Sequence, residues 1–358
     1  MSPSPRSTDP IASGGRAMVR DIGSGASLPA SIDVRTAYDF AVSLAREVGE
    51  HDELPAEDRR WLERARAALP ERVRRTFDDE MCIFGAGLLV DRPEVTDAAS
   101  FVDLLHRTTG GEFATAVLAD NMRDPARQAE VAAGLAGDLT AVDSLLAAWP
   151  DHMHGWLSRL LVDADALASE VADLMAEWLP LYQEVEPRVR AIIERDADMR
   201  AADIASLRPA DLIERTTSGV RWLSEPGVRR VVLAPSFLVR PYNFKFTGDD
   251  WRLFIYPVSD SALEPHDPLA PPQSVLRLHR ALGDDTRLRI LRLLTDRDWY
   301  LTEIAERLEL SKPTIKHHLA QLRAAGLVTL TEEGGLSYYS LKRDRLGDAT
   351  SELVRFLS

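Results

Sequence analysis

The fold of the C-terminal part of this chain is decided by residues 301–328, which read LTEIAERLELSKPTIKHHLAQLRAAGLV. Apolar residues at helical spacing predict a short helix capped by Thr302, then a turn at Leu310 and Ser311. A second helix follows, with Ser311 as its cap and Pro313 in its first turn, where proline is tolerated. Two helices joined by so tight a turn predict a helix-turn-helix.

The second helix of this motif has an inner and an outer face. Ile315, Leu319 and Leu322 recur at spacings of four and three residues, so they share one face and are expected in the core. A step of about 100° per residue then predicts which side chains point outward. These outward residues are Pro313, Thr314, Lys316, His317, Ala320 and Gln321.

The charge distribution favours a nucleic-acid partner for this motif, although the whole chain is acidic with a net charge of -14. From Gln273 to Ser358 there are 14 Lys and Arg against 12 Asp and Glu, so the excess of acid lies upstream. Residues 311–330 carry Lys312, Lys316 and Arg323 and no acidic residue. Such a local basic patch is what contact with phosphates requires.

The candidate DNA-binding side chains fall into two kinds. Thr314, His317 and Gln321 can offer hydrogen bonds to base edges, whereas hydroxyl and ammonium groups on the same helix suit phosphates. The full set of expected DNA-binding residues is Ser311, Lys312, Thr314, Lys316, His317, Gln321, Arg323, Tyr338 and Lys342. His318 lies nearer the core edge and is expected to pack or cap.

Other elements complete a winged helix around this motif. A helix over Ser274–Leu282 is broken at Gly283, and a core helix then carries Leu288, Leu291 and Leu294 on one face. Beyond Gly326, two alternating strands at 327–330 and 336–341 are joined across Glu332-Glu333-Gly334-Gly335, which predicts a hairpin. A terminal amphipathic helix suited to dimer contact is marked by Leu346, Ala349, Leu353 and Phe356.

The segments Ala281–Leu294 and Leu301–Val328 and the Tyr338-Tyr339 wing resemble the arsenic-repressor (ArsR) family of winged-helix regulators. The Leu-Ser-x-Pro-Thr-x-x-x-His-Leu string at 310–319 is specific for this kind of helix-turn-helix. The resemblance covers roughly the last quarter of the chain. It implies a homodimer that binds a palindromic operator in double-stranded DNA, usually represses, and releases the DNA when it senses a signal.

The sequence departs from this family in three ways. Metal-sensing members place a Cys-x-Cys pair before the recognition helix, whereas residues 301–306 here contain no cysteine, which excludes thiolate metal sensing at that site. The wing tip carries Glu332 and Glu333 where a wing that contacts DNA is expected to be basic. The family is commonly a compact single domain, so Ala30–Pro257 is an addition that the motif does not explain.

The expected fold is mainly α, with two domains. Residues 1–29, rich in Ser, Pro and Gly, predict a disordered tail. A helical domain over 30–257 ends in a β-rich segment, 228–257, of about three short strands. A Pro-rich linker at 258–272 then leads to the winged helix-turn-helix at 273–358. Within the helical domain, the expected helices begin with one around residues 34–48 and continue at 57–69, 98–107, 112–121, 126–148, 164–178, 187–196 and 209–223.

The sequence gives little support for a membrane or secreted protein, for a reactive cysteine or for a histidine metal site. The apolar run at 81–90 has about half the length of a membrane span, and no secretory signal precedes it, so a cytoplasmic protein is expected. Cys82 is the single cysteine and is expected to be buried and inert. The His152 and His154 pair is better explained by packing than by a metal site.

No catalytic motif is found, so the chain is not expected to be an enzyme, and neither a cofactor nor a metal is expected. The front domain, 30–257, is expected either to sense a small-molecule effector or to enlarge a dimer interface. The alternative is an enzyme or a protein-interaction domain that the winged helix tethers to DNA.

Overall fold

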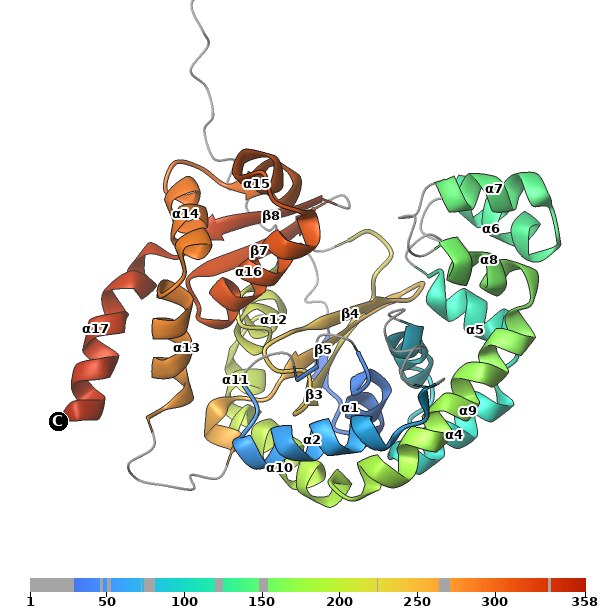
Figure 1. Cartoon of the computed structure of the whole chain (residues 1–358), viewed down its shortest axis with the longest axis horizontal. Coiled ribbons are helices and arrows are strands. Elements are labelled where there is room, and N and C mark those ends of the chain that lie inside the picture. The colour runs from blue at the N-terminus through green and yellow to red at the C-terminus, as the bar shows by residue number, and fades with distance from the viewer. Residues whose placement is uncertain are drawn as a thin grey trace, which may run out of the picture.

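A computed structural model describes residues 29–45, 48–49, 53–71, 73, 81–119, 125–147, 154–223, 225–263, 271–333 and 336–358. The expected tail lies outside the described residues, apart from residue 29, and so do residues 264–270 of the expected linker and the side chains of Cys82 and His152. Figure 1 shows the winged helix beside an arc of helices that curves around a small sheet. Among the described helices, none combines the length and the apolar character of a membrane span.

The N-terminal part is built on one four-stranded sheet with the order β1-β3-β5-β4. Strands β1, β3 and β5 run parallel, and β4 is antiparallel to β5. The three strands expected in 228–257 are present, whereas β1 was not expected because a three-residue strand shows no alternation. The strands are β1 (Ala30–Ile32), β3 (Arg230–Ser236), β4 (Phe244–Thr247) and β5 (Trp251–Pro257).

Helices cover this sheet and extend into the arc. One expected helix, 126–148, is two helices in the structure, because Gly137 has φ 92°, a left-handed conformation that ends the first of them. The helices are α1 (Thr36–Val42), α2 (Ala56–Ala68), η1 (Met81–Leu89), α4 (Ala98–Arg107), α5 (Gly110–Val117), α6 (Pro125–Leu135), α7 (Leu139–Ala147), α8 (His154–Val162), α9 (Ala164–Gln183), α10 (Glu186–Met199), α11 (Ala201–Ser206) and α12 (Pro209–Thr216).

A buried carboxylate joins α1 to the sheet and to α9. Asp39 accepts hydrogen bonds from the Tyr182 hydroxyl at 2.8 Å and from the backbone N–H groups of Phe237 and Leu238 at 2.7 and 3.0 Å. Burial raises the pKa of Asp39, and these donors, with the Ser236 hydroxyl, partly offset that effect. The carboxylate therefore satisfies backbone groups that would otherwise be buried without partners.

The winged helix has a hydrophobic core of its own. Ile315, Leu319 and Leu322 are fully buried in it, as their spacing predicts, together with Ile290 and Ile304. Its elements are α13 (Gln273–Leu282), α14 (Asp285–Leu294), β6 (Trp299–Tyr300), α15 (Leu301–Leu308), α16 (Lys312–Ala324), β7 (Val328–Glu333), β8 (Leu336–Leu341) and α17 (Arg343–Leu357).

A strand from the N-terminal part completes the sheet of the wing. Strand β2 (Val220–Trp222) pairs in parallel with β7, which gives the order β2-β7-β8-β6. The expectation of one helix over 209–223 is therefore wrong beyond Thr216. Ser218 and Gly219 have φ values of 57° and 110°, which end α12 and turn the chain into the strand.

The beginning of the expected linker is packed rather than loose. Val258 and Ala262 are buried in the N-terminal core, and residues 260–262 form a short 3-10 helix, η4 (Asp260–Ala262). Apolar side chains among the prolines thus keep residues 258–263 folded, and the linker expected at 258–272 is wrong for this first stretch. The domain boundary itself stays a prediction.

Candidate nucleic-acid interface

The helix-turn-helix is formed by α15 and α16. Glu309 takes a left-handed conformation, with φ 56°, after α15, and the Ser311 hydroxyl then caps α16 by accepting from the Thr314 N–H at 3.2 Å. The expected cap of the first helix is corrected: Tyr300 holds that position, and its N–H donates to Glu303 at 2.9 Å. Thr302 lies inside the helix.

The first turns of α16 present an exposed basic surface. Ser311, Lys312, Thr314 and Lys316 are exposed, while Ile315 between them is buried. The N-terminal end of a helix also carries partial positive charge, which adds to that of the two lysines. This half of the helix therefore offers ammonium groups, hydroxyl groups and a helix N-terminus to an anionic partner.

His317 and Gln321 are half-buried in a polar chain that leads to the N-terminal part. The Gln321 amide nitrogen lies 3.0 Å from His317 Nε2, and His317 Nδ1 lies 3.4 Å from the Tyr242 hydroxyl. Because the amide nitrogen can only donate, His317 Nε2 is the acceptor of this hydrogen bond. Arg287 in turn donates to the Gln321 carbonyl oxygen. Two of the three side chains expected to read base edges, His317 and Gln321, thus hold protein partners in this arrangement.

Arg323, also expected to bind DNA, does not lie among the exposed residues of α16. Its side chain is 5% exposed, and its guanidinium donates to the Thr217 carbonyl oxygen at 2.5 Å. The sequence contained a signal for this, since Arg323 lies four residues after the buried Leu319 and so next to the core face of α16. The arginine anchors α16 to the N-terminal part.

Two further residues expected to bind DNA, Lys342 and Tyr338, have partners outside α16. Lys342 forms an ion pair at 3.0 Å with Glu214 of α12. Burial alone would raise the pKa of Glu214, but the hydrogen bond and charge of Lys342, together with Arg221, lower it. Tyr338 packs its ring edge-on against Tyr300, with centroids 6.0 Å apart, on β8. Neither of these contacts involves a residue of α16.

His318 occupies the core edge of α16, where its spacing predicts it. Its side chain is 15% exposed, and Nδ1 lies 3.7 Å from the Asp284 carboxylate. Burial lowers the pKa of His318, and the charge of Asp284 offsets this only in part. The imidazole is therefore neutral at pH 7. The side chains of Glu332 and Glu333 at the wing tip lie outside the described residues.

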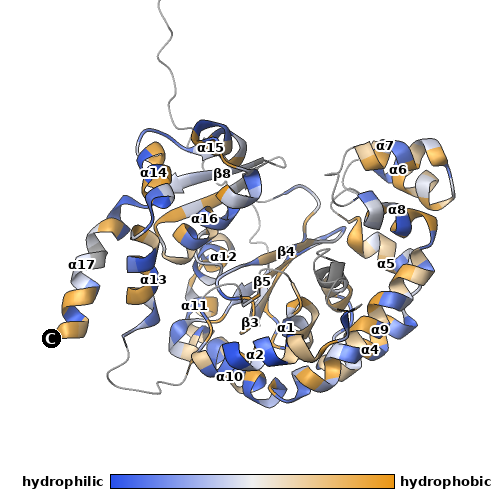
Figure 2. Ribbon diagram, in the orientation of Figure 1, coloured by the Kyte–Doolittle hydropathy of each residue, from blue (hydrophilic) through white to orange (hydrophobic). Residues whose placement is uncertain are grey.

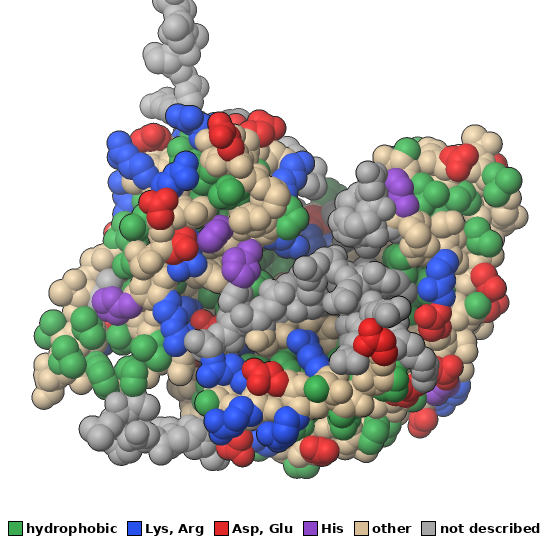
Figure 3. Space-filling model, in the orientation of Figure 1, with side chains coloured by type: hydrophobic (Ala, Val, Ile, Leu, Met, Phe, Trp, Pro, Cys, Tyr) green, Lys and Arg blue, Asp and Glu red, His purple; other side chains and the backbone are tan. Residues whose placement is uncertain are grey.

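The terminal helix α17 leaves apolar side chains in solvent. Leu346, Val354 and Leu357 are 39%, 56% and 72% exposed. Figure 2 colours the last turns of α17 hydrophobic, and Figure 3 shows hydrophobic side chains gathered over α13 and α17. Of the residues expected on this face, Leu353 and Phe356 are half-buried, and the side chain of Ala349 lies outside the described residues.

Comparisons with known proteins agree on residues within this region. The family described as "Bacterial regulatory protein, arsR family" matches residues 284–329. The HTH-type transcriptional regulator CmtR of Mycobacterium tuberculosis is 42% identical over 82 residues, which are 23% of this chain and 70% of CmtR. The transcriptional repressor SdpR of Bacillus subtilis is 37% identical over 79 residues, 22% of this chain and 88% of SdpR.

The solved structure of HlyU from Vibrio cholerae is 34% identical and covers 24% of this chain and 91% of HlyU, with a TM-score of 0.20. The identity to CmtR and SdpR extends over most of each relative, and the family match falls on α14, α15 and α16. Through its C-terminal winged helix, the chain belongs to the ArsR family of bacterial regulatory proteins.

Proposed function

We propose that this chain is a sequence-specific DNA-binding transcriptional regulator that acts as a dimer, with α16 as the helix that enters the major groove. The observation that carries the proposal is the capped first half of α16, which exposes Lys312, Thr314 and Lys316. No acidic residue occurs from 311 to 330 in a chain that is acidic overall. Such a surface binds phosphates and reads base edges.

The exposed apolar face of α17 supports the proposed dimer. Apolar side chains such as Val354 and Leu357 are better buried against a second copy of the same face than left in water. Two copies related by a two-fold axis would place their recognition helices in successive major grooves, about 34 Å apart. The proposed operator is therefore a palindrome in double-stranded DNA.

For the sign of regulation we favour repression. SdpR is a transcriptional repressor, whereas HlyU of Vibrio cholerae is a transcriptional activator, so family membership alone leaves both signs open. A repressor predicts that deletion of the gene raises transcription from its operator. Lower transcription after deletion would identify an activator.

We further propose that the N-terminal part is a sensor domain and that the chain acts in the cytoplasm. The sensing role is supported by contacts that link the N-terminal part to α16, namely those of Arg323 with Thr217 and of His317 with Tyr242. These contacts leave the apolar side chains of α17 exposed. A sensor domain must contact the element whose position it controls, and the N-terminal part contacts α16.

The proposed function is tested by fluorescence anisotropy with a duplex from the promoter region of the gene, at two salt concentrations. Lys316→Ala should weaken binding and lower the slope of log affinity against log salt by about 0.9, because one phosphate contact is lost. The charge-matched control is Arg107→Ala, at an exposed position in α4, which should bind like the wild type. Equal losses in both variants, or no preference of the wild type for its own promoter over random duplex, would contradict the proposal.

A further inference from the structure

A cavity of about 390 Å³ lies where the N-terminal part meets the winged helix. Arg277 of α13 and Ala324, the last residue of α16, line it from the winged helix, and the other lining residues come from the N-terminal part. Cavities of roughly 300 to 1,000 Å³ hold small organic molecules, and they occur preferentially where domains meet. A molecule bound here would touch both parts of the chain.

The lining of this cavity is polar and has more positive than negative charge. It contains four arginines, two aspartates and three serines, and no lysine or glutamate. Guanidinium groups bind planar carboxylates and phosphates through paired N–H donors, and serine hydroxyls add further donors. The composition therefore favours an anionic ligand over a cationic or an apolar one.

One wall of the cavity is already occupied by its own ion pairs. Arg240 and Arg277 both bind Asp260, and Arg277 also binds Glu53 at 2.7 Å. Burial alone would raise the pKa of Asp260, but the charges of the two arginines hold it at about 2. Because its donors have acceptors within the protein, this wall holds α13 against the N-terminal part rather than binding a ligand.

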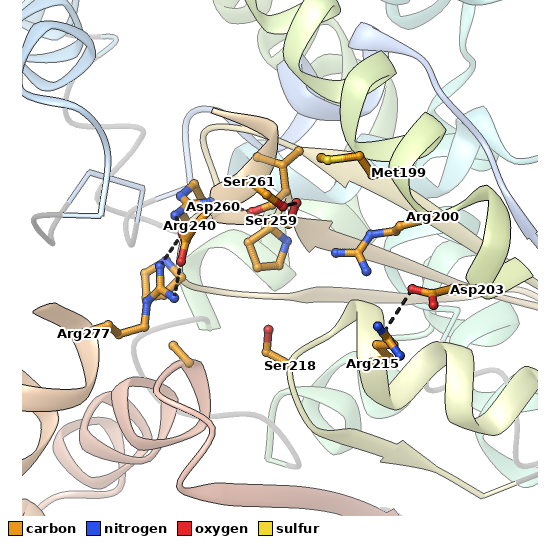
Figure 4. A pocket seen from close by; sticks show the side chains of 14 residues that line it. Met199, Arg200, Asp203, Arg215, Ser218, Arg240, Ser259, Asp260, Ser261 and Arg277 are labelled. Atoms are coloured by element: carbon orange, nitrogen blue, oxygen red, sulfur yellow. Dashed lines mark hydrogen bonds and ion pairs between the residues drawn. The ribbon is translucent and has the colours of Figure 1, made fainter. Parts of the chain in front are cut away.

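The opposite wall of the cavity offers hydrogen-bond donors to a ligand. Figure 4 shows Arg200 and Arg215 across the cavity from Arg240 and Arg277, with Ser218 between the two walls. Arg200 Nε lies 2.9 Å from Asp196, and Arg215 Nε lies 3.0 Å from Asp203. In both ion pairs the contacting nitrogen is Nε, and the Arg200 guanidinium also lies over the Tyr256 ring, 5.1 Å from its centroid. The terminal guanidinium nitrogens of Arg215, whose side chain is 62% exposed, can serve a further acceptor.

We propose that this cavity binds a small organic anion with a carboxylate or phosphate group, held by Arg200, Arg215 and Ser218, and that this anion is the effector of the regulator. This inference rests on the proposed function for its regulatory meaning. The effector would contact Ser218, which directly follows Thr217, the acceptor of the Arg323 bond, and precedes β2 on the wing. Binding would thus act at the point where α16 and β7 are joined to the N-terminal part.

The binding site is tested first without DNA. Thermal unfolding of the full chain is compared in sodium phosphate, sodium citrate and sodium chloride at equal ionic strength. Phosphate or citrate should raise the Tm above that in chloride, because a ligand that binds only the folded state stabilises it. The anion that gives the larger shift distinguishes a phosphate from a carboxylate effector.

The matched variants are Arg215→Gln and Arg208→Gln. Both arginines are exposed residues at the N-terminal cap or the last turn of α12, each in an ion pair with an aspartate, but only Arg215 lines the cavity. Arg215→Gln should abolish the anion-dependent rise in Tm, and Arg208→Gln should keep it. No rise in the wild type, or a rise that survives in Arg215→Gln, would overturn the proposed site.

Coupling to DNA is measured separately by anisotropy with the promoter duplex, at constant ionic strength. The anion that stabilises the wild type should change its DNA affinity by about fivefold or more, and this change should vanish in Arg215→Gln. An affinity that the bound anion leaves unchanged would overturn the effector role. A rise in Tm without any specific DNA binding would instead contradict the proposed function and leave the anion site standing, so the two failures are distinguishable.

Discussion

The winged helix has two sides that differ in burial: one packs against the N-terminal part, and the other, on α17, is exposed to solvent. Toward the N-terminal part, three of its elements have partners: β7 pairs with β2, Arg323 of α16 is buried against Thr217, and Lys342, which precedes α17, pairs with Glu214. On α17, by contrast, Val354 and Leu357 lie in water. The first side has the character of an interface within one chain, which is always present. The second side, the exposed apolar face of α17, is the proposed dimer interface.

The largest predicted effect comes from a substitution on the side of the winged helix that packs against the N-terminal part. Arg323→Ala should lower the free energy of unfolding by about 3 kcal/mol, because a charged donor to the Thr217 carbonyl and the buried arginine stem are both lost. Urea unfolding of the full chain measures this. Arg307→Ala, an exposed arginine on α15, is the control and should stay within about 0.5 kcal/mol of the wild type. A loss below about 1 kcal/mol in Arg323→Ala would show that the anchor is dispensable.

A second prediction concerns the ion pairs that hold α13. Asp260→Asn should cost about 2 kcal/mol at pH 7, because the pKa of Asp260 is lowered from 3.8 to about 2 in the folded state. A lowered pKa stabilises the fold above the unfolded-state value. The difference between the wild type and Asp260→Asn should therefore shrink as the pH falls from about 4 towards 2.

Unfolding midpoints of both proteins across this pH range provide the measurement, with Asp103→Asn, an exposed carboxylate on α4, as the control. If the difference in stability between the wild type and Asp260→Asn stays constant from pH 7 to pH 2, the charge of Asp260 does not stabilise the contact between α13 and the N-terminal part.

The third prediction concerns substitutions on the exposed face of α17, which should have the smallest effect on folding. Val354→Glu together with Leu357→Glu should weaken the dimer by at least about tenfold, about 1.4 kcal/mol, because two apolar side chains in the interface become charged. The free energy of unfolding of the monomer should change little, since both positions are exposed.

Sedimentation equilibrium over a range of protein concentrations measures the dimer constant. Leu288→Glu is the matched control, a leucine of α14 that is 48% exposed. A dimer constant unchanged by the double substitution would move the proposed interface away from α17.

The parts of this structure that the sequence predicts are those governed by local patterns. The spacing of Ile315, Leu319 and Leu322 predicts the inner face of α16, and Ser311 predicts its first residue, because periodicity and capping depend on neighbouring residues alone. The joint between the two parts is not predictable in this way. The register places Val220 beside Leu330, and a three-residue strand carries no periodicity of its own.

The same limit explains why the partners of two expected DNA-binding residues could not be predicted. Net charge predicts that Arg323 and Lys342 contact phosphate, but their partners, Thr217 and Glu214, come from a turn and a helix distant in the sequence. Lys312 and Lys316 are exposed as expected, because their exposure depends only on the orientation of α16 about its own core.

Strand β2 has a consequence for dissecting the protein. Without it, β7 would present a row of unpaired backbone N–H and C=O groups along one margin of its sheet, and such a margin is a template for pairing with other chains. A fragment cut at Gln273 would also lose the partners of Arg323 and Lys342. We expect that fragment to self-associate through β7 and precipitate. In this chain, the segment that resembles a self-sufficient module depends for its solubility on a strand that precedes it by some fifty residues.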